Sequence, residues 1–401
     1  MDLDFGEACE RLREEVRSFC ATHWPPRGDD AALPRREQEI RFRRRAIEAG
    51  LLHRTVPRAY GGAETPTDVL AETVIRQELD AAGVPHRSSV QGTHMLVPTL
   101  LECGTPEQCR RYIPGTLLGE ILWCQGYSEP GAGSDLASLQ SRAVLDGGTW
   151  VIHGHKIWTS QALEADAMFG LFRTEPEAPR HAGISYLLLD MRAPGITARP
   201  LRMMNGGDDF CEVFLDGVRV PAENLVGRRG EGWKVSRATL RHERMLIGDA
   251  SGLRRTFDGL VALAGRAQRG GRPALADPAI RQRLAEIEGF VATQEYASYR
   301  MLTAIARGRD ADVMAEMLTA KLYSTETLQR ISGLALDLLG DEGLLAPGAD
   351  ERRMGIRPFT DETWVSQTML SMAQAIAGGA SNIQRNIIGE RLLGLPRDPR
   401  R

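Results

Sequence analysis

Residues 123–135 read Trp-Cys-Gln-Gly-Tyr-Ser-Glu-Pro-Gly-Ala-Gly-Ser-Asp. The stretch begins with apolar residues and ends in a turn rich in Gly and Ser, which exposes backbone N–H groups and hydroxyls. Such a turn suits a polar, flat or anionic ligand, although turns of this composition are also common where nothing binds. The segments on either side of it decide between these two interpretations.

The chain before this stretch is predicted to be helical. Apolar side chains recur every three or four positions from residue 5 to residue 19, which places them on one face of an amphipathic helix. Residues 38–53 and 68–83 follow the same pattern, and a loop rich in Pro and Gly separates them at 56–62. The basic run at 41–45 is flanked by glutamates, so we expect a solvated helix face there and not an anion site.

The chain after this stretch first turns to β structure. Asp146-Gly-Gly148 separates two strand-like runs, as in a β-hairpin, and residues 210–216 alternate with the period of two that is typical of a strand. Long helical patterns return after Gly230, including residues 313–338, whose apolar spacing is that of a helix buried in a bundle.

The order of elements is therefore helices, then strands, then helices, and we expect an α+β fold. The predicted domains are an N-terminal helical domain at residues 1–119, a middle β-barrel or sandwich domain at 120–228, and a C-terminal four-helix bundle at 229–401.

Composition narrows the function classes. The 401 residues carry 50 Lys and Arg against 53 Asp and Glu, and a net charge of -3 argues against a nucleic-acid binder. No apolar run approaches the roughly 20 residues of a membrane helix. The six cysteines form no CxxC pair and the histidines form no metal-ligand cluster, so we expect reduced thiols and no metal. The first residues do not read as a secretory or transit signal, and we expect a cytoplasmic protein.

Three motifs give the chain a specific resemblance. Glu-Pro-Gly-Ala-Gly-Ser-Asp at 129–135 and Gly-His-Lys-Ile-Trp-Thr-Ser at 154–160 closely resemble the paired signatures of the acyl-CoA dehydrogenase family of flavoproteins. Residues 377–394 resemble that family's C-terminal signature, and the order of helices and strands is also that of its fold. The resemblance covers essentially the whole chain and implies that FAD is the cofactor.

The resemblance also implies which residues contact FAD. The turn would contribute Gln125, Tyr127, Ser128, Gly133 and Ser134. The second motif would place Trp158 on the flavin, with Thr159 beside it and Ser160 bonded near flavin N5. The C-terminal signature would bring Ala380, Ser381 and Asn382 to the ribityl and diphosphate groups. Looser matches are Arg269, for the diphosphate, and Asp337 with Gly340, for a turn that touches the FAD of a neighbouring subunit.

The catalytic base requires a choice between two positions. Removal of the α-proton of a thioester needs a carboxylate whose pKa burial raises toward the working pH. Many family members carry that Glu in the C-terminal signature, where this chain has Gly378. Other members carry it before an Arg on the first helix after the β-domain, which corresponds here to Glu243, followed by Arg244. We therefore predict Glu243 as the base. The resemblance further implies that Ser134, Arg244, Gly378 and Gly379 contact the substrate and that the Gly378 N–H polarises the thioester carbonyl.

The predicted activity is an FAD-dependent acyl-CoA dehydrogenase that makes a 2,3-enoyl-CoA. The resemblance implies an electron-transfer flavoprotein as acceptor and a homodimer or homotetramer. Two alternatives stay open: a flavin monooxygenase or oxidase of the same fold, and a non-catalytic FAD-binding subunit of a hetero-oligomer. The sequence does not identify the acyl chain, nor does it decide between a CoA and an acyl-carrier-protein thioester.

Overall fold

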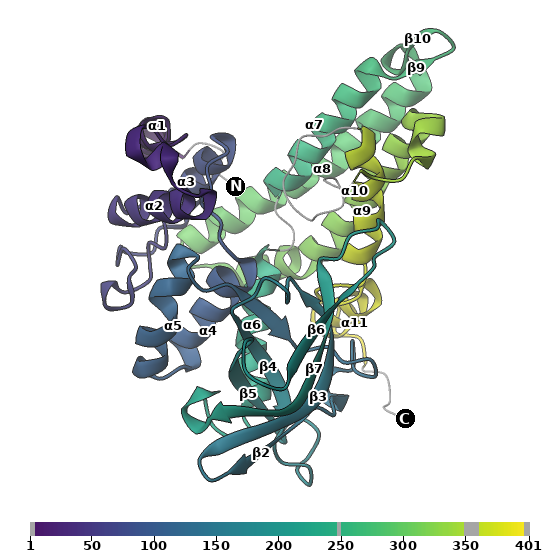
Figure 1. Ribbon diagram of the computed structural model, residues 1–401. Coiled ribbons are helices and arrows are strands. Elements are labelled where there is room, and N and C mark those ends of the chain that lie inside the picture. The colour runs from purple at the N-terminus through teal and green to yellow at the C-terminus, as the bar shows by residue number, and fades with distance from the viewer. Residues whose placement is uncertain (1–4, 247–249, 349–360, 397–401) are drawn as a thin grey trace. The chain divides into compact units, whose positions relative to one another are not determined.

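The computed structural model describes residues 5–246, 250–348 and 361–396. The chain forms two compact units, which we describe separately (Figure 1). The helix–sheet unit comprises Leu3–Pro200 and Phe210–His242, and the bundle unit comprises Leu201–Asp209 and Glu243–Arg401.

Amphipathic helices open the helix–sheet unit, as the apolar spacing predicts. They are α1 (Glu7–His23), α2 (Arg35–Glu48), α3 (Val69–Ala81), α4 (Val97–Cys103) and α5 (Pro106–Leu118). α1 buries Val16 and Cys20, and Asp68 caps α3 by accepting the N–H groups of Leu70 and Ala71. A π-helical segment, Val90–Leu96, leads directly into α4. All six cysteines are free thiols.

The basic run at 41–45 differs from the expectation at one position. Arg41 and Arg45 lie at the surface and pair with Asp30, but Arg43 is buried. Its guanidinium donates to the carbonyls of Leu118 and Pro85, at 2.7 and 3.2 Å. The interpretation of the whole run as a solvated face was therefore wrong for Arg43, because backbone carbonyls distant in the chain solvate its charge.

The strands of this unit form one sheet. They are β1 (Trp123–Gly126), β2 (Arg142–Asp146), β3 (Thr149–Ser160), β4 (Ala167–Arg173), β5 (Ile184–Asp190), β6 (Ile196–Leu201), β7 (Phe210–Pro221) and β8 (Leu225–Val226). Their order is β6-β7-β3-β2-β4-β5-β8, and β1 pairs with β4 in parallel. The predicted hairpin joins β2 to β3 through Gly147 and Gly148, both at positive φ, which a two-residue hairpin loop of this kind requires.

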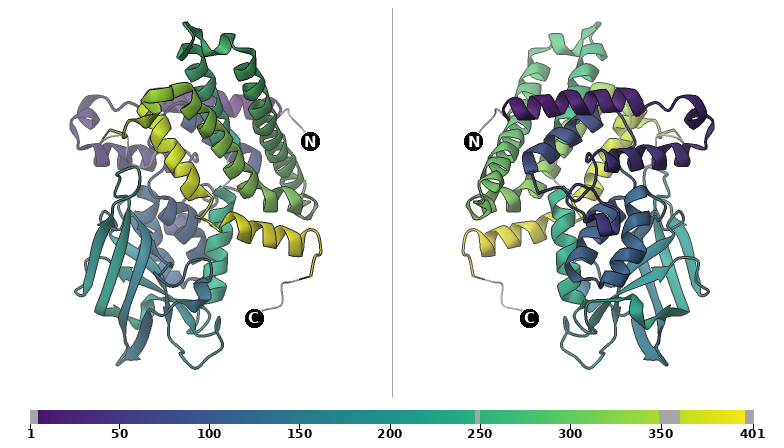
Figure 2. Two further views of the ribbon diagram at one scale, coloured as in Figure 1. Left: turned by 90° about the vertical axis from the view of Figure 1, so that its right-hand side faces the viewer. Right: turned by 90° about the vertical axis from the view of Figure 1, so that its left-hand side faces the viewer.

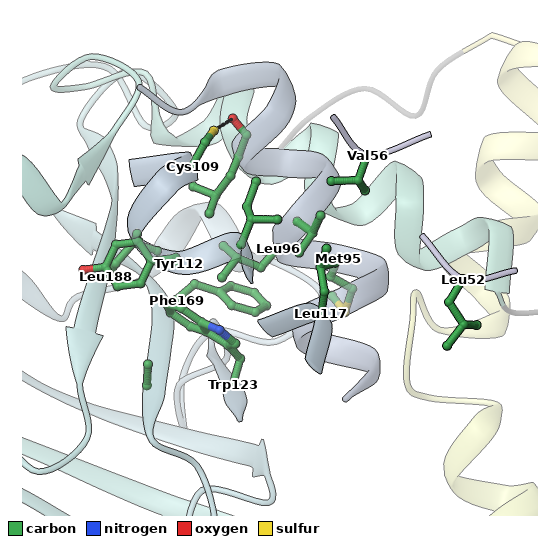
Figure 3. Close-up of a cluster of buried hydrophobic side chains, with 14 of the residues drawn as sticks. Leu52, Val56, Met95, Leu96, Cys109, Tyr112, Leu117, Trp123, Phe169 and Leu188 are labelled. Atoms are coloured by element: carbon green, nitrogen blue, oxygen red, sulfur yellow. Dashed lines mark hydrogen bonds between the residues drawn. The ribbon is translucent and has the colours of Figure 1, made fainter. Parts of the chain in front are cut away.

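Apolar side chains cover both faces of this sheet. One cluster fills the space between the sheet and the N-terminal helices, where Tyr112 of α5 packs edge-on against Trp123 of β1, with Phe169 and Leu188 close by (Figure 3). A second cluster on the opposite side includes Trp150 and Phe172. Helix α6 (Gly232–Leu246) joins the first cluster through Val235, and the Thr239 hydroxyl bonds that of Thr99 at 2.9 Å.

The bundle unit is helical. Its helices are α7 (Ala250–Arg266), α8 (Pro278–Ala306), α9 (Met314–Leu339), α10 (Asp361–Gln374) and α11 (Ser381–Arg391), and a short hairpin of β9 (Gln268–Arg269) and β10 (Arg272–Pro273) joins α7 to α8. Residues of α7 to α10 share one core that includes Phe257, Val291, Ile331 and Trp364. The predicted helix over 313–338 is confirmed as α9. The chain bends sharply between α10 and α11 (Figure 2). Helical ends around a central β-domain confirm the predicted fold class.

Candidate active site

A buried ion pair joins the first two motifs of the sequence. The Lys156 ammonium, from β3, lies 2.7 Å from the Glu129 carboxylate in the turn after β1, and both side chains are buried. Lys156 also donates to the carbonyls of Tyr127 and Leu171, at 3.3 and 2.7 Å. Glu129 in turn accepts the N–H groups of Gln140 and Ser141. Burial opposes the charged form of Glu129, but these partners outweigh it and hold its pKa below the usual value.

This pair fixes a turn whose outer edge is open. Glu129 and Ala132 exchange both backbone hydrogen bonds, at 3.0 Å each, which closes the turn. Beyond it, Gly133 and Ser134 are exposed, and in the described part of the chain no acceptor meets their N–H groups. A Cβ on Gly133 would meet no atom of the described residues within 4 Å, so none of these residues demands glycine there. Open N–H groups and unused space together suit a ligand that approaches the backbone closely.

A bulge in β3 turns Trp158 outward beside this turn. The pairing of β3 with β7 shifts between Lys156 and Thr159, and Trp158 lies in that shift with φ +59. A regular strand would place Trp158 on the buried face with Lys156. Instead its indole is 59% exposed and meets Phe210 edge-on. The Ile157 N–H donates to the Ser128 carbonyl at 2.9 Å, so the turn and the exposed indole are neighbours.

The other residues predicted for this region divide between surface and core. Gln125, Ser128 and Ser160 are half-buried. Tyr127 is buried, with its ring against Phe169 and Tyr186. Thr159 is fully buried on the opposite side of the strand from Trp158. Their predicted contacts with FAD stay predictions.

The C-terminal signature forms a second, separate group within the bundle unit. Gly378 and Gly379 link α10 to α11 with φ +61 and φ +93. The Ser381 N–H returns to the Ala375 carbonyl at 2.9 Å, which closes the turn, and the Gln384 side chain reaches the Gly378 carbonyl at 3.4 Å. The Gly378 N–H donates to no residue that the structure describes. Ala380, Ser381 and Asn382 form the N-terminus of α11.

The more loosely matched residues lie elsewhere in the bundle unit. Arg269 is exposed in the hairpin after α7, and Asp337 pairs with Arg283 at 2.6 Å. Gly340, at the end of α9, precedes Gly343–Pro347, which line a cavity of about 320 Å³. About four turns of α9 separate Asp337 from the part of that helix that contacts the Gly379 turn, or roughly 24 Å. Within one chain, Asp337 is thus far from the Gly379 turn.

Glu243 and Arg244 belong to α6, but their side chains lie outside the described residues. The predicted base is therefore untested by the structure.

Sequence reasoning missed the role of Glu129 and Lys156, although both stand inside the quoted motifs. The available signal was a lysine inside the strand-like run that follows Gly148, because a lysine that such a strand buries needs a partner.

Comparison with known protein families decides the identity. The family models described as the N-terminal, middle and C-terminal domains of acyl-CoA dehydrogenase match residues 6–120, 124–218 and 230–393. The chain belongs to the acyl-CoA dehydrogenase family. It is an oxidoreductase that acts on CH–CH bonds, and FAD is its cofactor, as in the other acyl-CoA dehydrogenases.

Individual acyl-CoA dehydrogenases match along nearly the whole chain. Acyl-CoA dehydrogenase IpdE1 of Mycobacterium tuberculosis is 38% identical over 97% of this chain and 98% of its own. Among solved structures, the Tcur3481-Tcur3483 steroid ACAD has a TM-score of 0.78 at 29% identity, covering 99% of this chain and 100% of that one. The ChsE4-ChsE5 complex from Mycobacterium tuberculosis has a TM-score of 0.78 at 27% identity, with coverage of 99% and 100%.

The residues present fit a flavin. An exposed indole offers a flat apolar surface, and the neighbouring turn offers N–H donors with no acceptor among the described residues. None of the residues that the structure describes fills the space beside Gly133. Among the residues described, no cluster of His, Cys, Asp or Glu could hold a metal ion, and no helix is long and apolar enough to cross a membrane.

Proposed function

We propose that this acyl-CoA dehydrogenase removes the α- and β-hydrogens of an acyl-CoA thioester and produces the 2,3-enoyl-CoA. The observation that carries the proposal is the Gly378 N–H, which donates to no described residue while the turn around it is closed by hydrogen bonds. A fixed N–H donor without an acceptor is what stabilises the negative charge that develops on a thioester oxygen.

The other residues have complementary roles in this proposal. Glu243 removes the α-proton, and Arg244 and Ser134 contact the CoA thioester. Bound FAD supplies the acceptor for the hydride that leaves the β-carbon. Trp158 and Ser128 hold the flavin at the helix–sheet unit, and the Gly133 and Ser134 N–H groups face ligand instead of protein. Ala380, Ser381 and Asn382 at the α11 N-terminus suit the negatively charged part of the cofactor.

A ring-bearing acyl group is the substrate class that we propose. The support is the similarity to a steroid ACAD along the whole chain, together with a glycine in place of the bulkier Glu at position 378. The test is anaerobic bleaching of the FAD-loaded protein with matched straight-chain, branched and steroid-ring acyl-CoAs. Fastest bleaching by the ring-bearing thioester supports the proposal. If none of these thioesters bleaches the flavin of fully FAD-loaded protein, the dehydrogenase activity itself is contradicted.

Assembly with a second, different acyl-CoA dehydrogenase chain is a further candidate. Two structural relatives carry paired names, Tcur3481-Tcur3483 and ChsE4-ChsE5, the second of them a complex. Leu344 and Leu345 support an interface of either kind, homo- or hetero-oligomeric, because they are 84% and 62% exposed. Purification of the chain alone, followed by assay of FAD content and mass, distinguishes the homo-oligomer from the hetero-oligomer.

The proposed function also includes an electron-transfer flavoprotein as electron acceptor and a cytoplasmic location.

A further inference from the structure

A buried lysine in the bundle unit forms no ion pair with any residue that the structure describes. Lys321 is on α9 and only 4% of it is exposed. In the described part of the chain no carboxylate comes within ion-pair distance of its ammonium, and burial lowers its pKa. An unpaired charge in a protein interior is destabilising, so its presence calls for an explanation.

The contacts of Lys321 lead to the turn of the C-terminal signature. Its ammonium donates to the Gly379 carbonyl and to the Gln374 carbonyl, both at 2.9 Å. The Gln374 carbonyl belongs to the last turn of α10, where a cation is favourable against the helix dipole. The Gly379 carbonyl lies just before α11. The residue before Gly379 is Gly378, whose N–H has no acceptor among the described residues.

Holding the Gly378–Gly379 turn in place does not by itself require the charge of Lys321. Gln384 already holds the Gly378 carbonyl with a neutral amide, at 3.4 Å. The ammonium also lies near the N-terminus of α11, where the helix dipole is itself positive. The two carbonyls and the C-terminus of α10 accept this charge, and a positive group at this place also stabilises negative charge that develops close to it.

We propose that Lys321 is a positioning residue for the reaction: it holds the Gly378–Gly379 turn with the Gly378 N–H free, and its charge strengthens the stabilisation of the thioester oxyanion by that N–H. This inference rests on the proposed function. No bond to substrate is formed by Lys321, and the proton of the reaction goes to Glu243.

The test uses the FAD-loaded protein and acetoacetyl-CoA, a thioester whose α-proton is acidic. The absorbance of the bound enolate, followed against pH, gives the pKa of the bound ligand. Lys321→Met removes the charge and both hydrogen bonds, Lys321→Gln keeps a neutral donor, and Lys321→Arg keeps the charge. Ser332→Ala, a buried hydroxyl on the same helix, is the matched control for loss of a polar group from α9.

We expect the parent and Ser332→Ala to lower the pKa of bound acetoacetyl-CoA equally. Lys321→Met and Lys321→Gln should weaken that shift by about tenfold in the ionisation constant, less than the roughly hundredfold loss typical of a donor that touches the oxyanion. Lys321→Arg should recover part of it. FAD content should stay at the parent level.

Three results would overturn the inference. If a neutral Lys321 variant binds FAD fully and ionises the ligand as the parent does, the charge of Lys321 has no part in stabilising the enolate. Failure of both neutral variants to fold assigns Lys321 to structure alone. A parent that does not lower the ligand's pKa overturns the proposed function and this inference together.

Discussion

Lys156 and Glu129 form a buried ion pair, 2.7 Å between charged atoms, that ties the Gly-rich turn to the strand that carries Trp158. Lys156 also holds the Tyr127 and Leu171 carbonyls, so one ammonium group joins the turn after β1 to β3 and β4. Burial lowers the pKa of Lys156 to about 8, although Glu129 opposes that shift. The pair orders the turn and the strand at which we propose that the flavin binds.

Glu129→Gln should destabilise the chain strongly, because it leaves the Lys156 ammonium buried without its counter-charge. Breaking a buried pair from one side typically costs about 3 to 5 kcal/mol of unfolding free energy. The double variant Glu129→Gln with Lys156→Met should recover part of that loss, since neither charge is then left alone. Urea unfolding followed by fluorescence checks both. Equal stability of the single and the double variant would count against the pair as the cause.

The stability of the chain should decrease as the pH falls from about 6.5 to about 4. Burial is the largest cause that lowers the pKa of His53 from 6.5 to about 4, and the same holds for His94. The unfolded state therefore binds protons first, so the stability that neutral His53 contributes is present above pH 6.5 and is lost through this range. The largest loss is about 3 kcal/mol for each group.

His53→Asn is the variant that checks this pH dependence. Asn tolerates the positive φ of 48 at this position better than most residues. The variant should lose stability at pH 7, where the native histidine is neutral, but its urea midpoint should vary less with pH between 7 and 5. A slope equal to that of the parent would show that His53 is not the titrating group.

Glu243→Gln should leave FAD bound and nearly abolish flavin reduction by substrate. Position 378 is glycine, so that position of the family's base offers no second carboxylate. Loss of a positioned base typically costs roughly 100- to 10,000-fold in rate. Stopped-flow bleaching of the flavin measures it, with Glu243→Asp as the variant that retains a carboxylate. A Gln variant with more than about a tenth of the parent rate would disprove the assignment.

Gly378→Glu combined with Glu243→Ala should restore measurable dehydrogenation. The two positions of the base serve the same carbon in this family, and catalysis depends on a carboxylate within about 3–3.5 Å of it. The rescue will be incomplete, because φ at Gly378 is +61, which costs a side-chain-bearing residue about 1 to 2 kcal/mol.

Gly378→Ala with Glu243→Ala is the matched control for this rescue, since it shares the backbone strain but has no carboxylate. The rescued enzyme should prefer a slimmer acyl chain than the parent. Activity in the Ala control equal to that of the Glu variant would mean that the new carboxylate is not the base.

The chain should purify as a dimer or a larger assembly with FAD bound. Leu344 and Leu345, both exposed, follow the segment that would touch the neighbour's cofactor. Leu344→Glu with Leu345→Glu should lower the assembled mass and the FAD content together, measured by light scattering and absorbance, whereas Val144→Glu, at an exposed position of β2, should change neither. A monomer of 44.1 kDa that holds FAD would contradict the two-chain site.

The sequence alone determined the parts of this protein that depend on local periodicity and turn chemistry. The helix at 314–339 follows from apolar spacing, and the β2–β3 hairpin follows from Gly147 and Gly148, because both features concern residues that are neighbours in the chain. The three motifs sufficed to predict the family and its cofactor.

The tertiary structure alone decided which charges are buried and which side chains face outward. Three charged residues that the sequence would place at the surface are buried: Arg43, Lys156 and Lys321. Each donates hydrogen bonds to backbone carbonyls of residues distant in the chain. Trp158 faces outward because pairing with β7 shifts the register of β3, whereas regular alternation would bury it. The local sequence pattern does not predict these partners. A buried charge and a β-bulge are both stabilised by contacts between segments that only folding brings together.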